Sequence, residues 1–246
     1  MLTRTLELKN LLSQGVSIQD LENFYDGEDC YILLTGPSLN DYEPEFLKDK
    51  LKDKLVFSVK QSFSTFKEIC DFHFWNCSNL PLSGEKVTPY EYDLFSKPIV
   101  IGSSNFALGQ RWNPKQKIDF FVKIPMLEEV GKENCLVFTK NYDQYLFNKT
   151  LKRPVGPGIM LETVLYFAVH LGIRNIYTLG WDLNAHGSHF YKEDDVSNRG
   201  CQIPWDIQAA ADSVPSIVDW LKSHNINLKT ISKTSTISEK VERVTL

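Results

Sequence analysis

The sequence predicts an α/β protein of Rossmann type, with a doubly wound, mainly parallel sheet and helices on both of its faces. Apolar runs of strand length lie at residues 30–34 and 55–59, and a third predicted strand, in which His73 alternates with aromatic residues, lies at 71–76. Helical patterns at 43–54 and 63–69 separate these three strands. Continuous apolar strands are typical of parallel sheets that helices cover on both sides. The alternation of strand and helix is the rhythm of a doubly wound fold.

The remaining segments lie on either side of this first βαβαβ unit, and we expect one domain over residues 1–246. Residues 1–25 predict a helical preface, because leucines recur there at three- and four-residue spacing and Ser17 is a good N-cap. In the middle, where residues 98–102 and 135–138 predict strands, the stretch 78–152 leaves room for a lid over the site. The last third predicts, in order, a helix at 158–171, a strand at 175–179, a helix at 206–224, a strand at 226–231 and a polar tail at 233–246.

Composition and charge narrow the class of protein. The 246 residues carry a net charge of −4, which argues against non-specific nucleic-acid binding, because such binding depends on an excess of Lys and Arg. The five cysteines are scattered without the spacing of a zinc site, so we expect reduced thiols in a cytoplasmic protein. No run approaches the ~20 apolar residues of a membrane span. Peripheral membrane contact and oligomerisation stay open.

The first candidate binding loop, which follows the first predicted strand, consists of Thr35, Gly36, Pro37 and Ser38. Open α/β sheets bind ligands at the carboxyl ends of their strands. Gly36 permits close approach of the backbone, Pro37 stiffens the turn and Ser38 can donate or cap, which suits a phosphate or a ribose. An ordinary strand-to-helix turn is the alternative, since the loop is neither a Walker loop nor a GxGxxG fingerprint.

A second loop, at residues 153–160 and including Gly156, Gly158 and Ile159, leads into the long apolar helix predicted at 158–171. Exposed amides and the helix dipole at such a position favour an anion. A rigid entry turn is the alternative.

A third loop, with Asp182, His186 and His189, follows the strand at 175–179. A carboxylate there can bind a sugar or ribose, and a histidine can act as a general base near neutral pH. A flexible polar loop would explain the same residues. No third zinc ligand is obvious, so we predict no metal site. Asn76, at the tip of the third predicted strand, is a further candidate because parallel strand ends converge.

Four motifs together resemble those of small bacterial lipooligosaccharide sialyltransferases and of the related hydroxymethylpterin pyrophosphokinase-like proteins. They are ILLTGPSL at 32–39, FHFWN at 72–76, GPGIM at 156–160 and LGIRNIYTLGWD at 171–182. The resemblance implies a fold that binds a CMP-activated sugar without a metal. It implies that Gly36, Pro37 and Ser38 border the nucleotide and that Asn76 helps to hold the donor. It assigns Gly158 and Ile159 to the phosphate and cytidine end, and Asp182 to the ribose or base side.

The sequence departs from the family pattern at four points. Thr35 stands where the family often has Gly-Asn ahead of Gly-Pro-Ser. Gln61 or Lys60 stands where the family has an Asn, and Gly156 with Pro157 replaces a Ser. Residues 201–206 contain no His where the family keeps its catalytic one, so His189 is expected to take the role of base.

These observations predict a glycosyltransferase-like enzyme. It would transfer a sugar, such as sialic acid or a related nonulosonate, from a CMP-activated donor to a glycan or small-molecule acceptor, with no cofactor required. His189 would remove the acceptor proton, with His186 and Asp182 as further catalytic candidates. A second hypothesis is an Mg²⁺-dependent pyrophosphokinase that uses four carboxylates, namely Asp182, Glu162, Asp194 and Asp195. A third is a nucleotide- or sugar-binding module without turnover.

Overall fold

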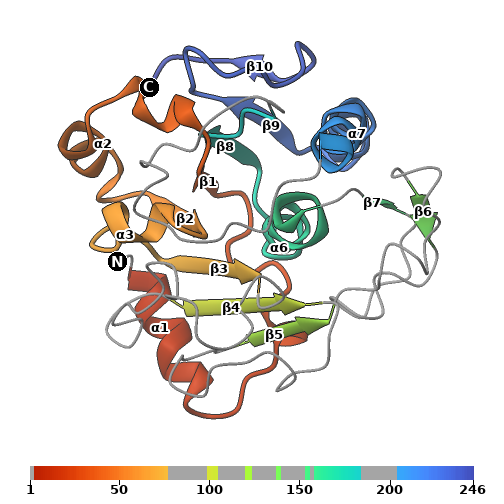
Figure 1. Cartoon of the computed structure of the whole chain (residues 1–246). Coiled ribbons are helices and arrows are strands. Elements are labelled where there is room, and N and C mark those ends of the chain that lie inside the picture. Colours follow the sequence, from red (N-terminus) through yellow and green to blue (C-terminus); the bar gives the residue numbers. More distant parts are fainter. Residues whose placement is uncertain are drawn as a thin grey trace, which may run out of the picture.

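The computed structural model describes residues 3–76, 99–104, 120–123, 137–139, 153–155, 158–183 and 204–246. Its main strands are β1 (Asp29–Leu33), β2 (Leu55–Val59), β3 (Phe72–Asn76), β4 (Ile99–Ser104), β5 (Phe120–Lys123), β8 (Asn175–Leu179), β9 (Asn227–Thr230) and β10 (Glu242–Arg243). Within the described residues these eight strands form one sheet in the order β10-β9-β8-β1-β2-β3-β4-β5, and every neighbouring pair is parallel (Figure 1).

Helices cover both faces of this sheet, which confirms the predicted Rossmann-type α/β fold. The α-helices in the part of the chain that the structure describes are α1 (Thr3–Leu12), α2 (Pro44–Leu51), α3 (Ser62–Phe66), α6 (Leu165–His170) and α7 (Pro204–Ser223). Alternate residues of β1 point to opposite faces, as a strand's period of two requires. Ile32 belongs to the core that includes α1, α6 and α7, whereas Leu33 belongs to the core that includes α2 and α3. Figure 1 shows α2 and α3 on one side of the sheet and α6 and α7 on the other.

Within the described residues, three shorter helical turns connect these elements. Two are 3-10 turns, η1 (Ile18–Leu21) and η2 (Pro37–Asp41), and one is the π-helical turn η4 (Met160–Val164), which runs directly into α6. Since α6 leads into a strand of the parallel sheet, the beginning of the η4–α6 helix lies toward the carboxyl edge of that sheet.

The middle of the chain differs in part from the prediction. The stretch 78–152, in which we expect a lid, contributes β4 and β5 to the main sheet, and β5 has no counterpart among the predicted strands. Its third described strand, β6 (Val137–Thr139), pairs antiparallel with β7 (Arg153–Val155), so the loop expected to open the apolar helix begins as a strand. The rest of that stretch lies outside the described residues.

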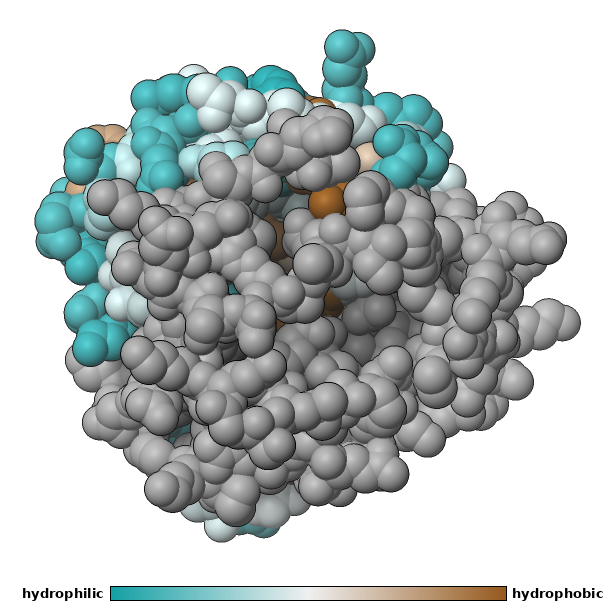
Figure 2. All heavy atoms as spheres, in the orientation of Figure 1, coloured by the Kyte–Doolittle hydropathy of each residue, from teal (hydrophilic) through white to brown (hydrophobic). Residues whose placement is uncertain are grey.

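The C-terminal segment predicted as a polar tail packs on the fold. Ile237 and Val241 are buried in the main core, and β10 pairs with β9 at the edge of the sheet. The prediction missed this packing because the few apolar residues stand singly among polar ones. On the face drawn in Figure 2, the described residues over α2 and β10 present mainly hydrophilic side chains.

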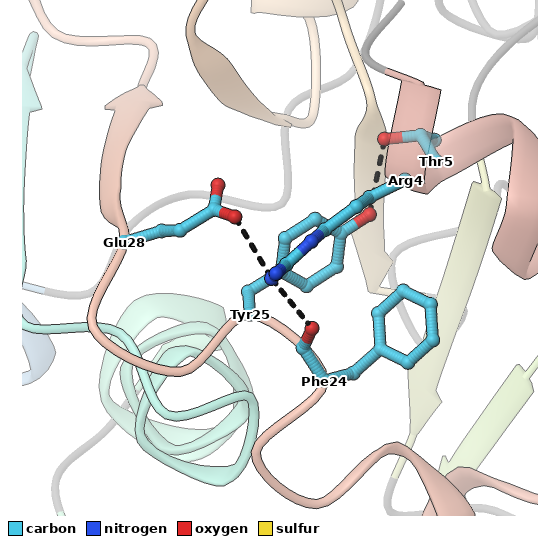
Figure 3. Close-up of polar contacts among 5 residues, drawn as sticks. All are labelled: Arg4, Thr5, Phe24, Tyr25 and Glu28. Carbon is cyan, nitrogen blue, oxygen red and sulfur yellow. Dashed lines mark hydrogen bonds and ion pairs between the residues drawn. The ribbon is translucent and has the colours of Figure 1, made fainter.

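The helical preface is attached at the amino edge of the sheet. The buried hydroxyl of Thr5 donates to Asp71 Oδ1 at 2.8 Å and lies 3.0 Å from the Tyr25 hydroxyl, whose pKa is raised by burial. Arg4 donates to the Phe24 carbonyl at 3.0 Å and forms an exposed ion pair with Glu28 at 2.9 Å (Figure 3). Asp71 immediately precedes β3, so these contacts lie at the end of the sheet opposite the predicted site.

Candidate functional site

The order of the strands reverses at β1. From β1 the chain continues through β2, β3, β4 and β5 on one side, and later returns to the other side of β1 with β8, β9 and β10. The loops after β1 and β8 therefore lie side by side at the carboxyl edge. In open α/β sheets this switch point is where ligands bind.

The two loops at the switch point are hydrogen-bonded to each other. The Ser38 amide donates to Asp182 Oδ2 at 2.8 Å, and the Gly36 amide donates to the Gly180 carbonyl at 2.8 Å. A Cβ atom at Gly36 would lie only 2.3 Å from Asp182 Oδ2, so this approach requires glycine. The structure thus brings together Ser38 and Asp182, which the sequence placed in separate candidate loops.

The two carboxylate oxygens of Asp182 have different surroundings. Asp182 is 6% exposed, and its Oδ2 is occupied by the Ser38 amide. Its Oδ1 is buried and accepts no hydrogen bond from the part of the chain that the structure describes. A buried carboxylate oxygen without a partner is unfavourable, because it has lost its water. A hydrogen-bond donor on a ligand would satisfy this oxygen.

Three hydrogen-bond donors of the first loop, from Gly36 and Ser38, bind within the protein. The amides of Gly36 and Ser38 bind to the loop after β8, and the Ser38 hydroxyl donates to Ser232 Oγ at 2.9 Å. A phosphate needs such donors, whereas a ribose supplies hydroxyl donors of its own. These three donors of the loop are already bound within the protein.

The other described candidates lie along the same edge. Thr35 and Pro37 are half-buried at the end of β1, and Gln61 follows β2 with a buried Oε1 that has no partner among the described residues. Asn76 is the last residue of β3. Parallel strands end at a common edge, so these positions share it with Asp182.

The end of the second loop leads directly into the helical segment that begins with η4. Gly158 is exposed with φ +92°, and the buried Ile159 immediately precedes η4. Five of the candidates named above lie outside the described residues: Gly156, His186, His189, Asp194 and Asp195. No group of three or more His, Cys, Asp or Glu that could hold a metal occurs within the described ranges. No helix in those ranges is long and apolar enough to cross a bilayer.

A second buried polar cluster lies away from this edge. His73 Nδ1 and Ser58 Oγ are 2.9 Å apart, and Ser58 Oγ is also 2.9 Å from Cys70 Sγ. Burial lowers the pKa of His73 to about 3 and raises the pKa of Cys70 to about 12. Both groups are therefore neutral at physiological pH and fully enclosed, which supports the structural role that the alternation of His73 with aromatic residues predicts.

Sequence reasoning missed one group of residues at the site. Ser232, Ser235 and Thr236 follow β9 and contact the loops after β1 and β8. The signal was available, because Ser232 directly follows the last predicted strand and strand ends carry ligands in this fold.

Comparison with known proteins adds one structural likeness. No protein-family model and no curated protein matches the chain. Among solved structures, the chain is similar to the MAf glycosyltransferase from Magnetospirillum magneticum AMB-1, with 15% identity and a TM-score of 0.48. The match covers 93% of this chain and 37% of that protein, so the chain spans little more than a third of its length. At this identity and TM-score the likeness does not identify a function.

Proposed function

We propose that the protein is a glycosyltransferase-like enzyme that binds a nucleotide-activated sugar at the switch point and passes the sugar to an acceptor hydroxyl. The observation that carries the proposal is the buried carboxylate of Asp182, with one oxygen holding the first loop and the other without a partner among the described residues. The resemblance of the strand-end motifs to sialyltransferases supports a cytidine nucleotide as the carrier.

The proposal gives each loop a separate task. Asp182 Oδ1 accepts from a ribose hydroxyl or from the amino group of the base, since both are donors. The phosphate lies away from this carboxylate, because like charges in a poorly solvated site repel strongly. Gly158 and Ile159 offer the beginning of the helical run that starts with η4, where amides and the helix dipole favour an anion.

The chemical step is a displacement at the anomeric carbon. The acceptor hydroxyl attacks that carbon, the bond to the phosphate oxygen breaks, and the nucleotide leaves with the bonding electron pair. His189 is the proposed general base for the acceptor proton, and His186 is the alternative on the same loop. The donor sugar is proposed to be a nonulosonate such as sialic acid, and the acceptor a glycan or a small molecule. No cofactor is proposed, since the leaving phosphate would be stabilised by helix amides.

Calorimetry with CMP, CDP and Mg²⁺-ATP tests the proposal. We expect CMP to bind, and we expect Asp182→Asn to weaken it by about tenfold to a hundredfold, the effect of losing a hydrogen bond to a charged group. Asp219→Asn is the control, because that exposed carboxylate pairs only with Lys240 on the surface among the contacts described. Absence of cytidine-nucleotide binding at millimolar concentration would overturn the proposal.

Two further outcomes separate the alternatives. Binding of Mg²⁺-ATP in place of CMP would favour the pyrophosphokinase. CMP binding without sugar transfer or donor hydrolysis, over a broad acceptor panel, would favour a binding module. For the transferase we expect His189→Ala to abolish transfer while CMP affinity is retained, because a general base acts on the acceptor and not on the nucleotide.

A further inference from the structure

Ser232 joins three loops at the carboxyl edge of the sheet. Its buried hydroxyl accepts a hydrogen bond from the Ser38 hydroxyl at 2.9 Å and another from the Gly180 amide at 3.2 Å. Ser38 follows β1, Gly180 follows β8 and Ser232 itself follows β9. One side chain from the C-terminal part of the chain therefore connects both loops of the switch point.

Two residues after Ser232 hydrogen-bond to the backbone at Asp182 and at the residue before it. The Ser235 hydroxyl donates to the Trp181 carbonyl at 2.8 Å, and the Thr236 hydroxyl donates to the carbonyl of Asp182 itself. Leu183, the next residue, has φ +46°, a left-handed conformation that is unfavourable for leucine. Such a conformation persists only where surrounding contacts enforce it, and these two hydroxyls supply contacts directly beside it.

The segment 232–236 is itself anchored from two directions. Asp41, at the end of η2, accepts from the Thr234 amide at 2.9 Å and from the Thr234 hydroxyl at 2.6 Å. The guanidinium of Arg243, on β10, donates to the carbonyls of Ser232 at 3.3 Å and Ser235 at 2.6 Å. The segment is thus a braced structure on the main sheet.

We propose that residues 232–236 are a positioning segment of the nucleotide site, with Ser232 setting the spacing of the two switch-point loops and Thr236 setting the place of Asp182. The ligand role of the segment rests on the proposed function. The segment does not touch the reacting atoms in this proposal. It acts through Ser38, Gly180 and Asp182, and without it the unpartnered oxygen of Asp182 would not be held at one point.

Amide hydrogen exchange with CMP titration, on the wild type and on Ser232→Ala, tests the proposal. The Gly180 amide loses its acceptor in this variant, so its exchange is expected to rise about fivefold, the effect of one net hydrogen bond. The informative amide is that of Ser38, which donates to Asp182 and not to Ser232. If Ser232 positions the loops, Ser38 exchange also rises and the dissociation constant for CMP increases by about fivefold or more.

Two further variants sharpen the test. Thr236→Val keeps the shape of the side chain and removes its donor to Asp182, and we expect weaker CMP binding with unchanged Gly180 exchange. Asn227→Ala is the matched control, because Asn227 begins β9 at the opposite edge and donates to Asn175 at 2.9 Å. We expect this control to leave both readouts unchanged.

The outcomes separate this proposal from the proposed function. Unchanged exchange of the Ser38 amide in Ser232→Ala overturns the positioning role. If the wild type binds CMP, an unchanged CMP affinity in both Ser232→Ala and Thr236→Val also overturns it. If the wild type binds no cytidine nucleotide, the proposed function fails. The positioning of the loops is then decided by exchange alone, and a rise at Ser38 in Ser232→Ala still supports it.

Discussion

Replacing Gly36 with alanine tests the close approach on which the candidate site is built. The added Cβ would lie 2.3 Å from Asp182 Oδ2, 2.6 Å from the Gly180 carbonyl oxygen and 2.9 Å from Asp182 Cγ. Comfortable packing distances for carbon are about 3.5–4 Å, so the loops must separate by about 1 Å or more. Two hydrogen bonds of 2.8 Å, from the amides of Gly36 and Ser38, then lengthen or break.

The expected loss of stability follows from these contacts. Overpacking costs about 1–3 kcal/mol, and each weakened hydrogen bond adds about 0.5–1.5 kcal/mol. The two costs do not simply add, because separating the loops relieves the overpacking while it weakens the hydrogen bonds. We therefore expect Gly36→Ala to lower the free energy of unfolding by about 2–4 kcal/mol in urea denaturation. Gly27→Ala is the control: its Cβ meets nothing within 4 Å, and its φ of +76° costs about 1–2 kcal/mol in strain alone.

A double-mutant cycle identifies the cause of that loss. Asp182→Ala removes two of the three atoms that crowd the new Cβ at Gly36. The double variant should therefore be more stable than the sum of the two single effects predicts, by about 1 kcal/mol or more. Strict additivity, or a Gly36→Ala variant no less stable than Gly27→Ala, would refute the close approach as the source of the effect.

Three further predictions address the core, the helical preface and the C-terminal segment. Because the pKa of His73 lies at about 3, below its ordinary 6.5, the unfolded chain takes up a proton as the pH falls below about 6.5 while the folded protein does not. We therefore expect His73 to make the free energy of unfolding in urea about 2 kcal/mol lower at pH 5 than at pH 7.5. His73→Asn should reduce this pH dependence, and an unchanged pH dependence would contradict the assignment to His73. Thr5→Val should lower the free energy of unfolding by about 1–3 kcal/mol, because it removes a buried donor to Asp71. The control Arg4→Met, at an exposed ion pair, should lower it by about 1 kcal/mol or less. Equal losses would mean that the buried hydrogen bond of Thr5 adds no more than the exposed ion pair. Ile237→Ala should cost about 2–4 kcal/mol by thermal or urea unfolding, and a change near zero would mean that this segment is not part of the core.

The sequence was most informative where burial alone determines structure. The first strands, β1, β2 and β3, are rich in apolar and aromatic residues and are covered by helices, and their existence follows from composition and spacing. The edge strand β10 consists of Glu242 and Arg243, both exposed, and nothing in their local sequence favours a strand. It forms because β9 offers an unpaired edge to which its backbone can pair, and that edge exists only in the folded sheet.

The candidate site was predictable as a set of strand ends and not as a set of contacts. The rule that ligands bind beyond the carboxyl ends of parallel strands was enough to select Ser38 and Asp182. Their hydrogen bond joins residues 144 positions apart, and the register of β1 with β8 determines it. The place of Ser232 at a strand end could be predicted by the same rule, but its hydrogen bonds to Ser38 and Gly180 could not, because they also join residues far apart in the sequence.

In the proposed function Asp182 has both a structural and a ligand-binding role, and two substitutions separate the two. Asparagine can still accept the Ser38 amide with its side-chain oxygen, but its NH₂ group then replaces the unpartnered Oδ1 and faces the ligand's own donor. Alanine loses both functions and leaves the Ser38 amide without its acceptor. We therefore expect Asp182→Asn to weaken CMP binding with a change in unfolding free energy below about 1 kcal/mol, and Asp182→Ala to lower stability as well by about 1–3 kcal/mol. Equal losses of stability in the two variants, with equal affinities, would mean that Asp182 serves only to hold the loop.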